Sequence, residues 1–371
     1  MKKHILVISP FFYPHTGGSQ QYMEELYASL LTHHKDIEVT VLAYNTDGAP
    51  RKEAYRNMQI VRFPCLNILP GQFAIPNYME VASYLLNHKK DFDLIHCNTR
   101  FFESSWWAPF YAKFIGKQIF LTDHSSSYPE HQVLLVKKIS YILDRTCSFV
   151  ALRLFDQVLT TNNTTKGFLK RDFGVNSDVL YGGINQDLFK PVKRKNRQVK
   201  VLFVGRMIDS KGPHHLYEAA KKLPKVSFTF TGPGPYVEIL SQRLKKDKLK
   251  NVTILGGQNR QRVAKLMRES DILVHPSTHH EGLPNVLTEA GATGIAVIAT
   301  NVGGTKEIIP PGCGIILETN QLEELDKHIQ KLVGNKGLRE IYGRALYKHV
   351  SRTFNWKRAS DMLYKKILQA S

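Results

Sequence analysis

The sequence of 371 residues contains no uninterrupted apolar run that approaches the roughly 20 residues needed to span a membrane as a helix. Its uncharged stretch 63–79, for example, is broken by Pro64, Pro70 and Pro76. The first residues, MKKHILVISPFFYP, are basic and then apolar like a secretory signal, but the apolar part is short and no small-residue cleavage site follows. We therefore expect a buried first strand, no transmembrane helix and a cytoplasmic protein.

Cysteine is scarce, and two common cofactor motifs are missing. The four cysteines, Cys65, Cys97, Cys147 and Cys313, are widely spaced, without a Cys-x-x-Cys pair or a regular histidine partner. This spacing indicates reduced thiols rather than disulfides or a zinc site. The fingerprint G-x-G-x-x-G is also missing after the first predicted strand, which argues against a dinucleotide-dependent oxidoreductase.

Acidic residues are few: 32 Asp and Glu stand against 51 Lys and Arg, for a formal net charge of +19. Residues 1–180 hold 19 basic and 16 acidic residues, whereas residues 181–371 hold 32 and 16. The clusters 193-KRKNRQVK-200 and 243-RLKKDKLK-250 could meet nucleic acid, anionic lipid or a phosphorylated small molecule, or form a solvated basic surface. Neither has the interleaved aromatics of a nucleic-acid-binding protein, so we expect no nucleic-acid partner.

Length and composition predict two globular domains. A single core rarely serves 371 residues, and 42% apolar with 22% charged residues is the balance of a folded protein. Short apolar runs alternate with helical patterns, as in parallel sheets covered on both faces. The predicted strands are residues 4–9, 38–42, 59–63, 94–97, 118–122, 157–160 and 178–181, and then 199–205, 227–231, 252–255, 272–275, 296–300 and 314–317. The predicted helices include 19–31, 75–87 and 104–115, and helices continue from about residue 321 to the end.

This order predicts an α/β protein of two doubly wound parallel-sheet units, joined near residue 185. Ligands of such sheets bind outside the carboxyl ends of the strands, and two facing units leave a cleft between those ends. Candidate site residues should therefore directly follow predicted strands.

Two candidates follow strands of the first unit. Gly17 and Gly18 precede a helix expected from about Ser19, so bare backbone N–H groups can receive an anion there, although tight turns also need glycine. Asp123 and His124 follow the strand 118–122. His124 can position a hydroxyl or transfer a proton, or it can be an ordinary turn residue.

Two more candidates follow strands of the second unit. Arg206 lies just past the strand 199–205, and Lys211 precedes a helix expected from about Gly212. Two cations beside a helix N-terminus suit a diphosphate, and surface salt bridging is the alternative. The turn 231-TGPGP-235, with Gly232, lets backbone approach a flat ligand, or is only a turn.

The most informative stretch is 281-EGLPNVLTE-289. Glu281 lies in the loop before a helix expected from about Pro284, and Glu289 lies one to two turns inside that helix. Carboxylates accept hydrogen bonds from neighbouring hydroxyls, as on a sugar, while the helix N-terminus takes phosphate. The candidate backbone contacts are Gly282, Leu283, Pro284, Asn285 and Val286. This combination suits a nucleoside diphosphate sugar, with one carboxylate for the sugar and one for the ribose.

These residues, in this order, resemble the GT-B glycosyltransferases, specifically the retaining glycosyltransferase family four, also called glycosyl transferases group one. The similarity runs from 10-PFFYPHTGG-18 to the final helix containing Trp356. Its most specific part, residues 281–309, resembles the E-x7-E segment of that family.

The resemblance implies a GT-B fold with two facing Rossmann-like domains. Residues 1–183 would bind the acceptor, residues 184–354 the nucleotide sugar, and the last helix, about 355–371, would return to brace the first domain. The implied roles are as follows: Gly17 and Gly18 place amides by the donor phosphate, His124 meets the donor sugar, Arg206 and Lys211 neutralise the diphosphate, Glu281 holds sugar hydroxyls and Glu289 the ribose. No metal or cofactor is expected, because cations of the protein replace the metal.

Two departures from the family pattern leave acceptor selection and domain hinging open. Where the family often has Glu after the glycine pair, this chain has 19-SQQ-21, and Asn185 in 182-GGIN-185 stands where Asp is common. We expect a UDP- or GDP-sugar donor and a glycan or lipid-linked acceptor in the synthesis of cell-envelope polysaccharide or glycolipid. A GT-B sugar-nucleotide epimerase, a catalytically silent relative and a basic nucleic-acid-binding protein are the alternatives.

The segment 133-VLLVKKISYILDRTCSFVALRLF-155 mixes apolar residues with Lys137, Lys138, Arg145 and Arg153. Such a segment can lie on an anionic membrane, which would place the protein peripherally at the inner face of the cytoplasmic membrane. It can equally be a long core helix whose cations reach the surface.

Overall fold

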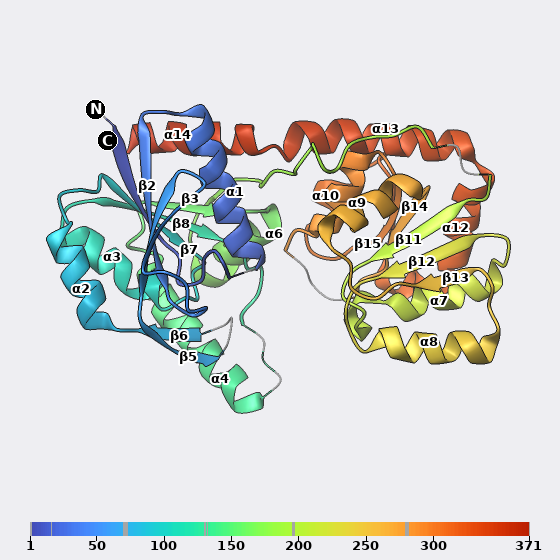
Figure 1. The fold of residues 1–371 in the computed structure, drawn as a ribbon, viewed down its shortest axis with the longest axis horizontal. Helices are drawn as coiled ribbons and strands as arrows, with labels where there is room; N and C mark the ends of the chain where they lie inside the picture. Colours follow the sequence, from blue (N-terminus) through green and yellow to red (C-terminus); the bar gives the residue numbers. More distant parts are fainter. Residues whose placement is uncertain are drawn as a thin grey trace. The chain divides into compact units, whose positions relative to one another are not determined.

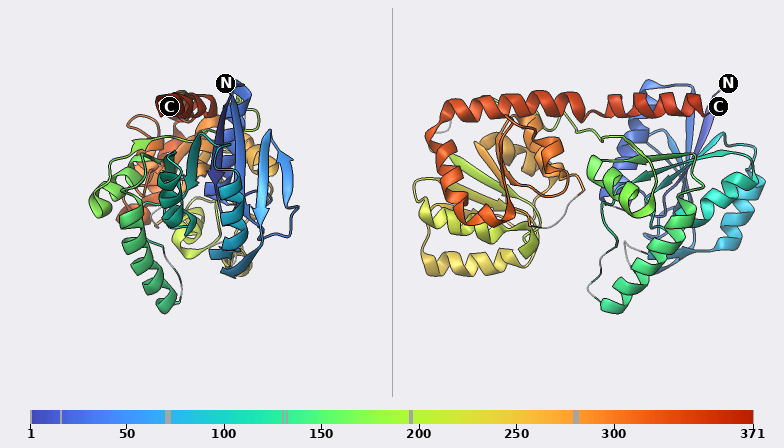
Figure 2. Two further views of the ribbon diagram at one scale, coloured as in Figure 1. Left: turned by 90° about the vertical axis from the view of Figure 1, so that its left-hand side faces the viewer. Right: turned by 180° about the vertical axis from the view of Figure 1, so that it is seen from behind.

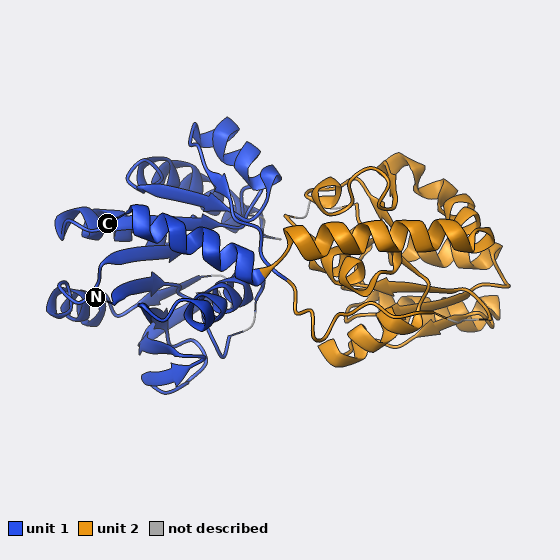
Figure 3. Cartoon of the chain, turned by 90° about the horizontal axis from the view of Figure 1, so that it is seen from above, with its two compact units in different colours: residues 1–183, 356–371 blue, residues 184–355 orange. Residues whose placement is uncertain are grey.

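A computed structural model describes residues 2–15, 17–69, 73–129, 131, 133–194, 197–278 and 282–370 (Figure 1). Glu281, a predicted site residue, lies outside the described residues. The chain divides into two compact units (Figure 3): unit 1 is Met1–Gly183 with Trp356–Ser371, and unit 2 is Ile184–Asn355.

Unit 1 contains an eight-stranded sheet with the strand order β10-β9-β8-β7-β1-β2-β4-β3. The strands are β1 (Lys3–Ile8), β2 (Ile37–Tyr44), β3 (Lys52–Tyr55), β4 (Met58–Phe63), β7 (Leu94–Asn98), β8 (Gln118–Asp123), β9 (Gln157–Thr160) and β10 (Asp178–Val179). All neighbours pair in parallel except β3 and β4. The predicted doubly wound parallel sheet is confirmed, and it carries one strand that was not predicted: β3, at its edge, is joined to β4 by a short turn, pairs with it antiparallel and stays partly exposed.

Helices cover both faces of this sheet. The helices of unit 1 are α1 (Gly18–His33), α2 (Tyr78–Asn87), α3 (Ser104–Phe114), α4 (Leu134–Leu143), α5 (Phe149–Ala151), α6 (Asn163–Phe168) and α14 (Trp356–Gln369), with π-helical turns at Asp144–Ser148 and Leu169–Phe173. Successive residues of β1 enter opposite cores: Leu6 packs with α2 and α3, whereas Val7 packs with α1 and α14. Both faces are therefore buried, which explains why the central strands are apolar without alternation.

The predicted helix over residues 75–87 is wrong at its start. The chain first forms a hairpin of β5 (Cys65–Leu69) and β6 (Phe73–Pro76), and α2 begins only at Tyr78. The side chain of Asn77 caps this helix by accepting a hydrogen bond from the Glu80 N–H, 3.4 Å away. Pro76 is the last residue of β6 and directly precedes the cap. Because proline has no backbone N–H to donate, the strand ends here.

Unit 2 contains an all-parallel six-stranded sheet with the order β13-β12-β11-β14-β15-β16. The strands are β11 (Lys200–Val204), β12 (Ser227–Thr231), β13 (Val252–Ile254), β14 (Ile272–His275), β15 (Ala296–Thr300) and β16 (Ile315–Leu317). The helices are α7 (Pro213–Lys222), α8 (Tyr236–Asp247), α9 (Arg260–Glu269), α10 (Asn285–Thr293), α11 (Thr305–Ile308), α12 (Leu325–Gly334) and α13 (Lys336–Thr353), with 3-10 turns at Asp209–Lys211 and Thr319–Glu324. The strand order reverses between β11 and β14, and ligands of doubly wound sheets bind at the carboxyl ends beside such a reversal.

All four cysteines carry free thiols. Within the described ranges, no helix combines the length and apolar character that crossing a membrane requires. The same residues contain no group of three or more His, Cys, Asp or Glu side chains that could hold a metal ion.

Candidate functional site

The loops that follow β11 and β12 in unit 2 are locked together by backbone contacts. The N–H of Gly205 donates to the carbonyl of Thr231 at 3.1 Å, and the N–H of Met207 donates to the carbonyl of Pro233 at 2.7 Å. Gly232 has φ +143°, and a Cβ added to it would lie 1.7 Å from the Gly205 carbonyl oxygen. Only glycine fits this approach, so packing between two loops accounts for Gly232, and any contact with a ligand stays a prediction.

The loop after β14 makes hydrogen bonds to the segment that carries Lys211. The N–H of Thr278 and the hydroxyl of Ser277 both donate to the Ser210 carbonyl, at 2.9 and 3.1 Å. Gly212 has φ +68°, and a Cβ there would lie 2.1 Å from the Pro276 carbonyl oxygen. The backbone on both sides of half-buried Lys211 is thus held by the loop after β14.

The N-terminus of α10 lies at the same edge of the sheet. Its first helical residue is Asn285, one residue after the predicted start, because Pro284 takes an extended conformation with φ −69° and ψ 102°. The Gly304 N–H donates to the Gly282 carbonyl at 2.8 Å, which anchors the preceding loop to the loop after β15. The first-turn N–H groups of a helix have no intrahelical acceptor, and they carry the positive end of the helix dipole.

Glu289 lies in the second turn of α10 and is 14% exposed. A guanidinium nitrogen of Arg260, the first residue of α9, lies 3.2 Å from its carboxylate. Burial raises the pKa of Glu289 to about 7, although Arg260 acts in the opposite direction. The carboxyl group therefore titrates near neutral pH, and it can donate as well as accept a hydrogen bond. Sequence reasoning missed Arg260, because only the tertiary fold brings it to Glu289.

The predicted residues of unit 2 thus follow neighbouring strands of one sheet. Exposed Arg206 and half-buried Lys211 follow β11, Gly232 follows β12, and α10 with Glu289 follows β14. Cations, a helix N-terminus and a carboxyl group beyond the carboxyl ends of parallel strands are the types of group that can bind an anion and hydrogen-bond to hydroxyls.

In unit 1 the glycine pair opens α1, the element that follows β1 along the chain. Gly17 is the N-cap and Gly18 the first helical residue, one residue before the predicted start. The cap makes no side-chain hydrogen bond, and the first turn has no acidic residue. A Cβ on Gly17 would lie 2.2 Å from Oε1 of Gln20, whereas one on Gly18 would meet nothing within 4 Å. The Gln20 side chain can turn away from such a Cβ, so local packing requires glycine at neither position.

His124 follows β8, and its ring packs edge-on against the ring of Tyr22 from α1, with a centroid distance of 4.9 Å. Its Nε2 is buried and has no hydrogen-bond partner among the described residues. Burial lowers the pKa of His124 to about 4, although the neighbouring Asp123 acts in the opposite direction. The imidazole is therefore neutral at pH 7 and can accept or donate one hydrogen bond.

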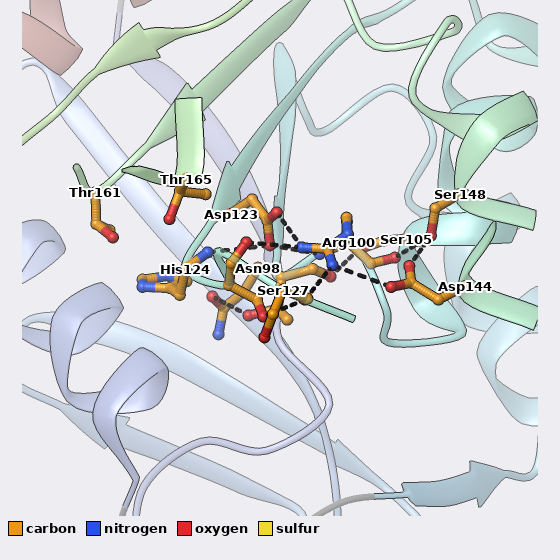
Figure 4. Close-up of polar contacts among 12 residues, drawn as sticks. Asn98, Arg100, Ser105, Asp123, His124, Ser127, Asp144, Ser148, Thr161 and Thr165 are labelled. Carbon is orange, nitrogen blue, oxygen red and sulfur yellow. Dashed lines mark hydrogen bonds and ion pairs between the residues drawn. The ribbon is translucent and has the colours of Figure 1, made fainter. Parts of the chain in front are cut away.

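The loop with His124 is held by a buried charge cluster that sequence reasoning missed (Figure 4). Arg100 is fully buried and pairs with Asp123 at 2.6 Å and with Asp144 at 3.0 Å. Its guanidinium also donates to the carbonyls of Ser125 and Ser127 at 3.0 and 2.7 Å. Asp123 also accepts the His124 N–H at 3.0 Å, so this carboxylate positions the loop rather than facing a ligand.

Two α/β units, each built on a largely parallel sheet with helices on both faces, are the architecture of GT-B proteins. Residues 16–188 match the family described as Glycosyltransferase Family 4, and residues 185–349 match Glycosyl transferases group 1. The chain belongs to the family 4 glycosyltransferases of the GT-B fold.

Relatives and solved structures agree with this assignment. An uncharacterized glycosyltransferase of Methanocaldococcus jannaschii is 28% identical, over 100% of this chain and 99% of its own length. The GPI3 component of phosphatidylinositol N-acetylglucosaminyltransferase from Saccharomyces cerevisiae is 21% identical, over 95% of this chain and 80% of its own. Sucrose-phosphate synthase of Thermosynechococcus elongatus has a similar fold, with a TM-score of 0.78 and 22% identity over the whole of both chains. The Anabaena protein HepE in complex with UDP has a TM-score of 0.76 and 18% identity, again over both chains.

Proposed function

We propose that this glycosyltransferase moves a sugar from a nucleoside diphosphate sugar to an acceptor hydroxyl. The observation that carries the proposal is the interlocked edge of unit 2, where Arg206, Lys211 and the N-terminus of α10 follow β11 and β14. A diphosphate carries two to three negative charges at neutral pH, and these groups supply the matching positive ones. The fold-related protein HepE has been crystallised with UDP and with UDP-glucose, which supports a donor of this class.

The donor contacts divide between the two ends of the ligand. Arg206 and Lys211 bind the diphosphate, and the N–H groups of Leu283, Asn285 and Val286 add hydrogen bonds to its oxygens. Glu289, with its pKa near 7, holds the ribose hydroxyls, because a carboxyl group at that pKa can pair with a hydroxyl in either protonation state. Glu281, as the family resemblance implies, holds hydroxyls of the sugar.

Bond breaking places negative charge on the diphosphate oxygen that leaves the sugar. Arg206 and Lys211 stabilise that charge without a metal, and stabilisation of this kind supplies several kcal/mol of barrier lowering. In the retaining reaction that we propose, the leaving oxygen takes the proton of the acceptor hydroxyl, and the new bond forms on the face from which the diphosphate departs. Neutral His124 and the amides of Gly17 and Gly18 contribute hydrogen bonds to the donor.

The acceptor is proposed to be lipid-linked, because α4 presents an unusual surface. None of the residues of α4 is buried, so the alternative of a core helix is wrong for Leu134–Leu143. Figures 1 and 2 show α4 projecting from the rest of unit 1. The exposed fractions are 66% for Leu134, 66% for Leu135, 48% for Ile139, 57% for Ile142, 45% for Phe149 and 52% for Val150.

Exposing these apolar side chains to water is unfavourable, because each Å² of apolar surface that is not buried costs about 25 cal/mol of free energy. Exposed Lys138 and Arg145 lie in the same segment. Arg153, at its end, packs over the ring of Phe149, 3.5 Å from the ring centroid. Apolar and cationic side chains together match the interface of an anionic bilayer. We propose that this segment, residues 133–153, rests on the inner face of the cytoplasmic membrane, where lipid-linked acceptors for cell-envelope polysaccharide or glycolipid are found.

Thermal-shift measurements with UDP, GDP, UDP-sugars and GDP-sugars test the donor assignment. One nucleotide class should raise the melting temperature of the wild type but not that of an Arg206→Ala, Lys211→Ala double variant. Sugar release should require an added acceptor. A donor that is converted without acceptor would instead indicate an epimerase, and a chain that binds none of these nucleotides would contradict the proposal.

A further inference from the structure

Unit 2 contains a cavity lined by none of the residues proposed to bind the donor. It has a volume of about 550 Å³, within the range of small-molecule pockets. Its wall includes Asp271, directly before β14, and Ala296, the first residue of β15. The cavity therefore opens at the amino ends of the strands, whereas Arg206 and Lys211 follow a carboxyl end. The two sites lie at opposite edges of one sheet.

The floor of this cavity is bare backbone. Gly294, which ends α10, has φ +64°, and Gly343 lies within α13. A Cβ on Gly343 would lie 2.3 Å from the Gly294 carbonyl oxygen, so the two segments approach each other backbone to backbone. Any side chain at Gly343 would force them apart, so the close approach that forms this floor depends on glycine.

One wall holds a fixed positive charge. The guanidinium of Arg194 donates to carbonyl oxygens at the C-terminal ends of α9 and α10: Met267 at 3.3 Å, Ser270 at 2.5 Å, Thr293 at 2.9 Å and Gly294 at 2.9 Å. Each of its three nitrogens is engaged in these bonds. Arg194 therefore braces the pocket and contributes its charge, and four of its five N–H donors are already used in these bonds.

Further cations surround the opening. Lys193, Lys336 and Arg344 are exposed at the cavity, and Arg339 lines it as well. Lys336 opens α13, so the positive end of an 18-residue helix adds to the field. No ion pair of Lys193 or Arg344 is found within the described part of the chain, which leaves both side chains available.

Only two acidic residues line the cavity, against five basic ones. The carboxylate of Asp271 accepts the Lys200 N–H at 2.9 Å, and that of Glu340 lies 3.9 Å from the Lys336 ammonium. Glu340 partly offsets Lys336, but five basic residues against two acidic ones still leave an excess of positive charge around the cavity. A solvated basic surface would have scattered charges on a convex face, whereas here the basic residues line a concave, partly open space with a fixed floor.

We propose that this cavity is a second anion site, which binds a small molecule that carries a phosphate or diphosphate group. Lys193 and Arg344 bind the phosphate oxygens, and Tyr347, which also lines the cavity, packs against the remainder of the ligand. A bilayer cannot enter a concave pocket of this size, and a nucleic acid would need an extended basic groove, so a small phosphorylated molecule fits the site best.

Isothermal titration calorimetry with inorganic pyrophosphate tests this site in the full chain. Charge reversal by Lys193→Glu with Arg344→Glu should weaken pyrophosphate binding at least about 10-fold, which is the loss of roughly 1.4 kcal/mol. The control is Lys245→Glu with Lys246→Glu on α8, which makes the same charge change at exposed positions outside the cavity and should retain affinity. An Arg206→Ala, Lys211→Ala variant should also keep this binding event.

Equal weakening in the α8 control would show that only net charge matters, and it would overturn the proposal. Loss of all pyrophosphate binding in the Arg206→Ala, Lys211→Ala variant would assign the anion to the donor edge instead, with the same consequence. Circular dichroism checks folding. If the charge reversals unfold the chain, the neutral pairs Lys193→Gln with Arg344→Gln and Lys245→Gln with Lys246→Gln make the same comparison.

Discussion

Arg260, the first residue of α9, places a guanidinium nitrogen 3.2 Å from the carboxylate of Glu289 in the second turn of α10. This one contact does not keep the carboxyl group ionised, since burial still raises the pKa of Glu289 to about 7. A group that changes protonation near neutral pH at the proposed ribose position links donor binding and stability to pH.

The first prediction concerns Glu289 and pH. Its pKa rises from 4.5 in the unfolded chain to about 7 in the folded protein, so between these values the folded state holds a proton that the unfolded state has lost. The free energy of unfolding should therefore fall as the pH rises through this window. Glu289→Gln should reduce that fall in urea unfolding between about pH 5 and about pH 8.

In Glu289→Gln, the free energy of unfolding should still decrease with rising pH, but by a smaller amount, because burial also raises the pKa of Glu103 to about 7. The exposed Glu323→Gln serves as the control and should leave the pH profile unchanged. A Glu289→Gln profile that matches the wild type would show that this carboxyl group is ionised throughout.

The second prediction concerns Lys211. Lys211→Ala should lower kcat about 100- to 1000-fold, the usual cost of removing one group that stabilises developing charge. Its circular dichroism spectrum should stay that of the wild type, because the local backbone is held by Ser210 and Gly212. Lys225→Ala, at an exposed position after α7, is the matched control and should keep full activity. Near wild-type turnover in Lys211→Ala would remove this residue from the diphosphate contacts.

The third prediction concerns Gly232. Gly232→Ala must move a backbone carbonyl that would lie 1.7 Å from the new Cβ, so it should destabilise unit 2 by at least about 2 kcal/mol. Gly256→Ala has a positive φ of +64° but open space around it, and it should cost only about 1 kcal/mol. Urea unfolding of both variants makes the comparison, and equal losses would mean that backbone conformation rather than the loop contact requires Gly232.

The fourth prediction concerns the buried ion cluster. Asp144→Ala removes a carboxylate that is 1% exposed and leaves the Arg100 charge with one buried partner, so it should destabilise the fold by about 3–5 kcal/mol. Glu324→Gln removes an exposed pair with Lys327 and should cause no measurable change. Chemical unfolding measures both, and a small loss for Asp144→Ala would mean that the serine carbonyls and Asp123 suffice for Arg100.

The fifth prediction concerns membrane contact. The wild type should sediment with phosphatidylglycerol vesicles, less strongly at high salt because the charged part of the attraction is screened. Leu135→Glu with Ile139→Glu should abolish sedimentation, whereas Ile239→Glu with Ile341→Glu, at exposed positions of unit 2, should not. Absence of wild-type binding at low salt would contradict the proposed surface.

Central strands such as β7 and β15 were predictable from the sequence, because each is short, fully buried and begins with apolar residues. The edge strand β3 and the hairpin of β5 and β6 were not predicted. Residues 73–76 have an apolar pattern that also fits the first turn of a helix, and only pairing with β5 makes them a strand.

The predicted site residues of unit 2 come from local signals, since glycine, cation and helix cap each follow a strand. Arg100 also follows a strand, β7, and Arg260 opens a helix after β13, but nothing local to either residue indicates its partners. Arg100 is separated from Asp123 and Asp144 by 23 and 44 residues, and Arg260 is separated from Glu289 by 29. Contacts over such separations leave no periodicity in the chain.

Neighbouring residues alone were enough to specify the alternation of strands and helices, the two sheets and the types of side chain at the strand ends, because these depend on local apolar patterns and turn residues. The raised pKa of Glu289, the locked loops around Gly232 and the unburied face of α4 depended on packing between distant segments. Burial and charge pairing are properties of a side chain's surroundings, and those surroundings exist only once the chain has folded.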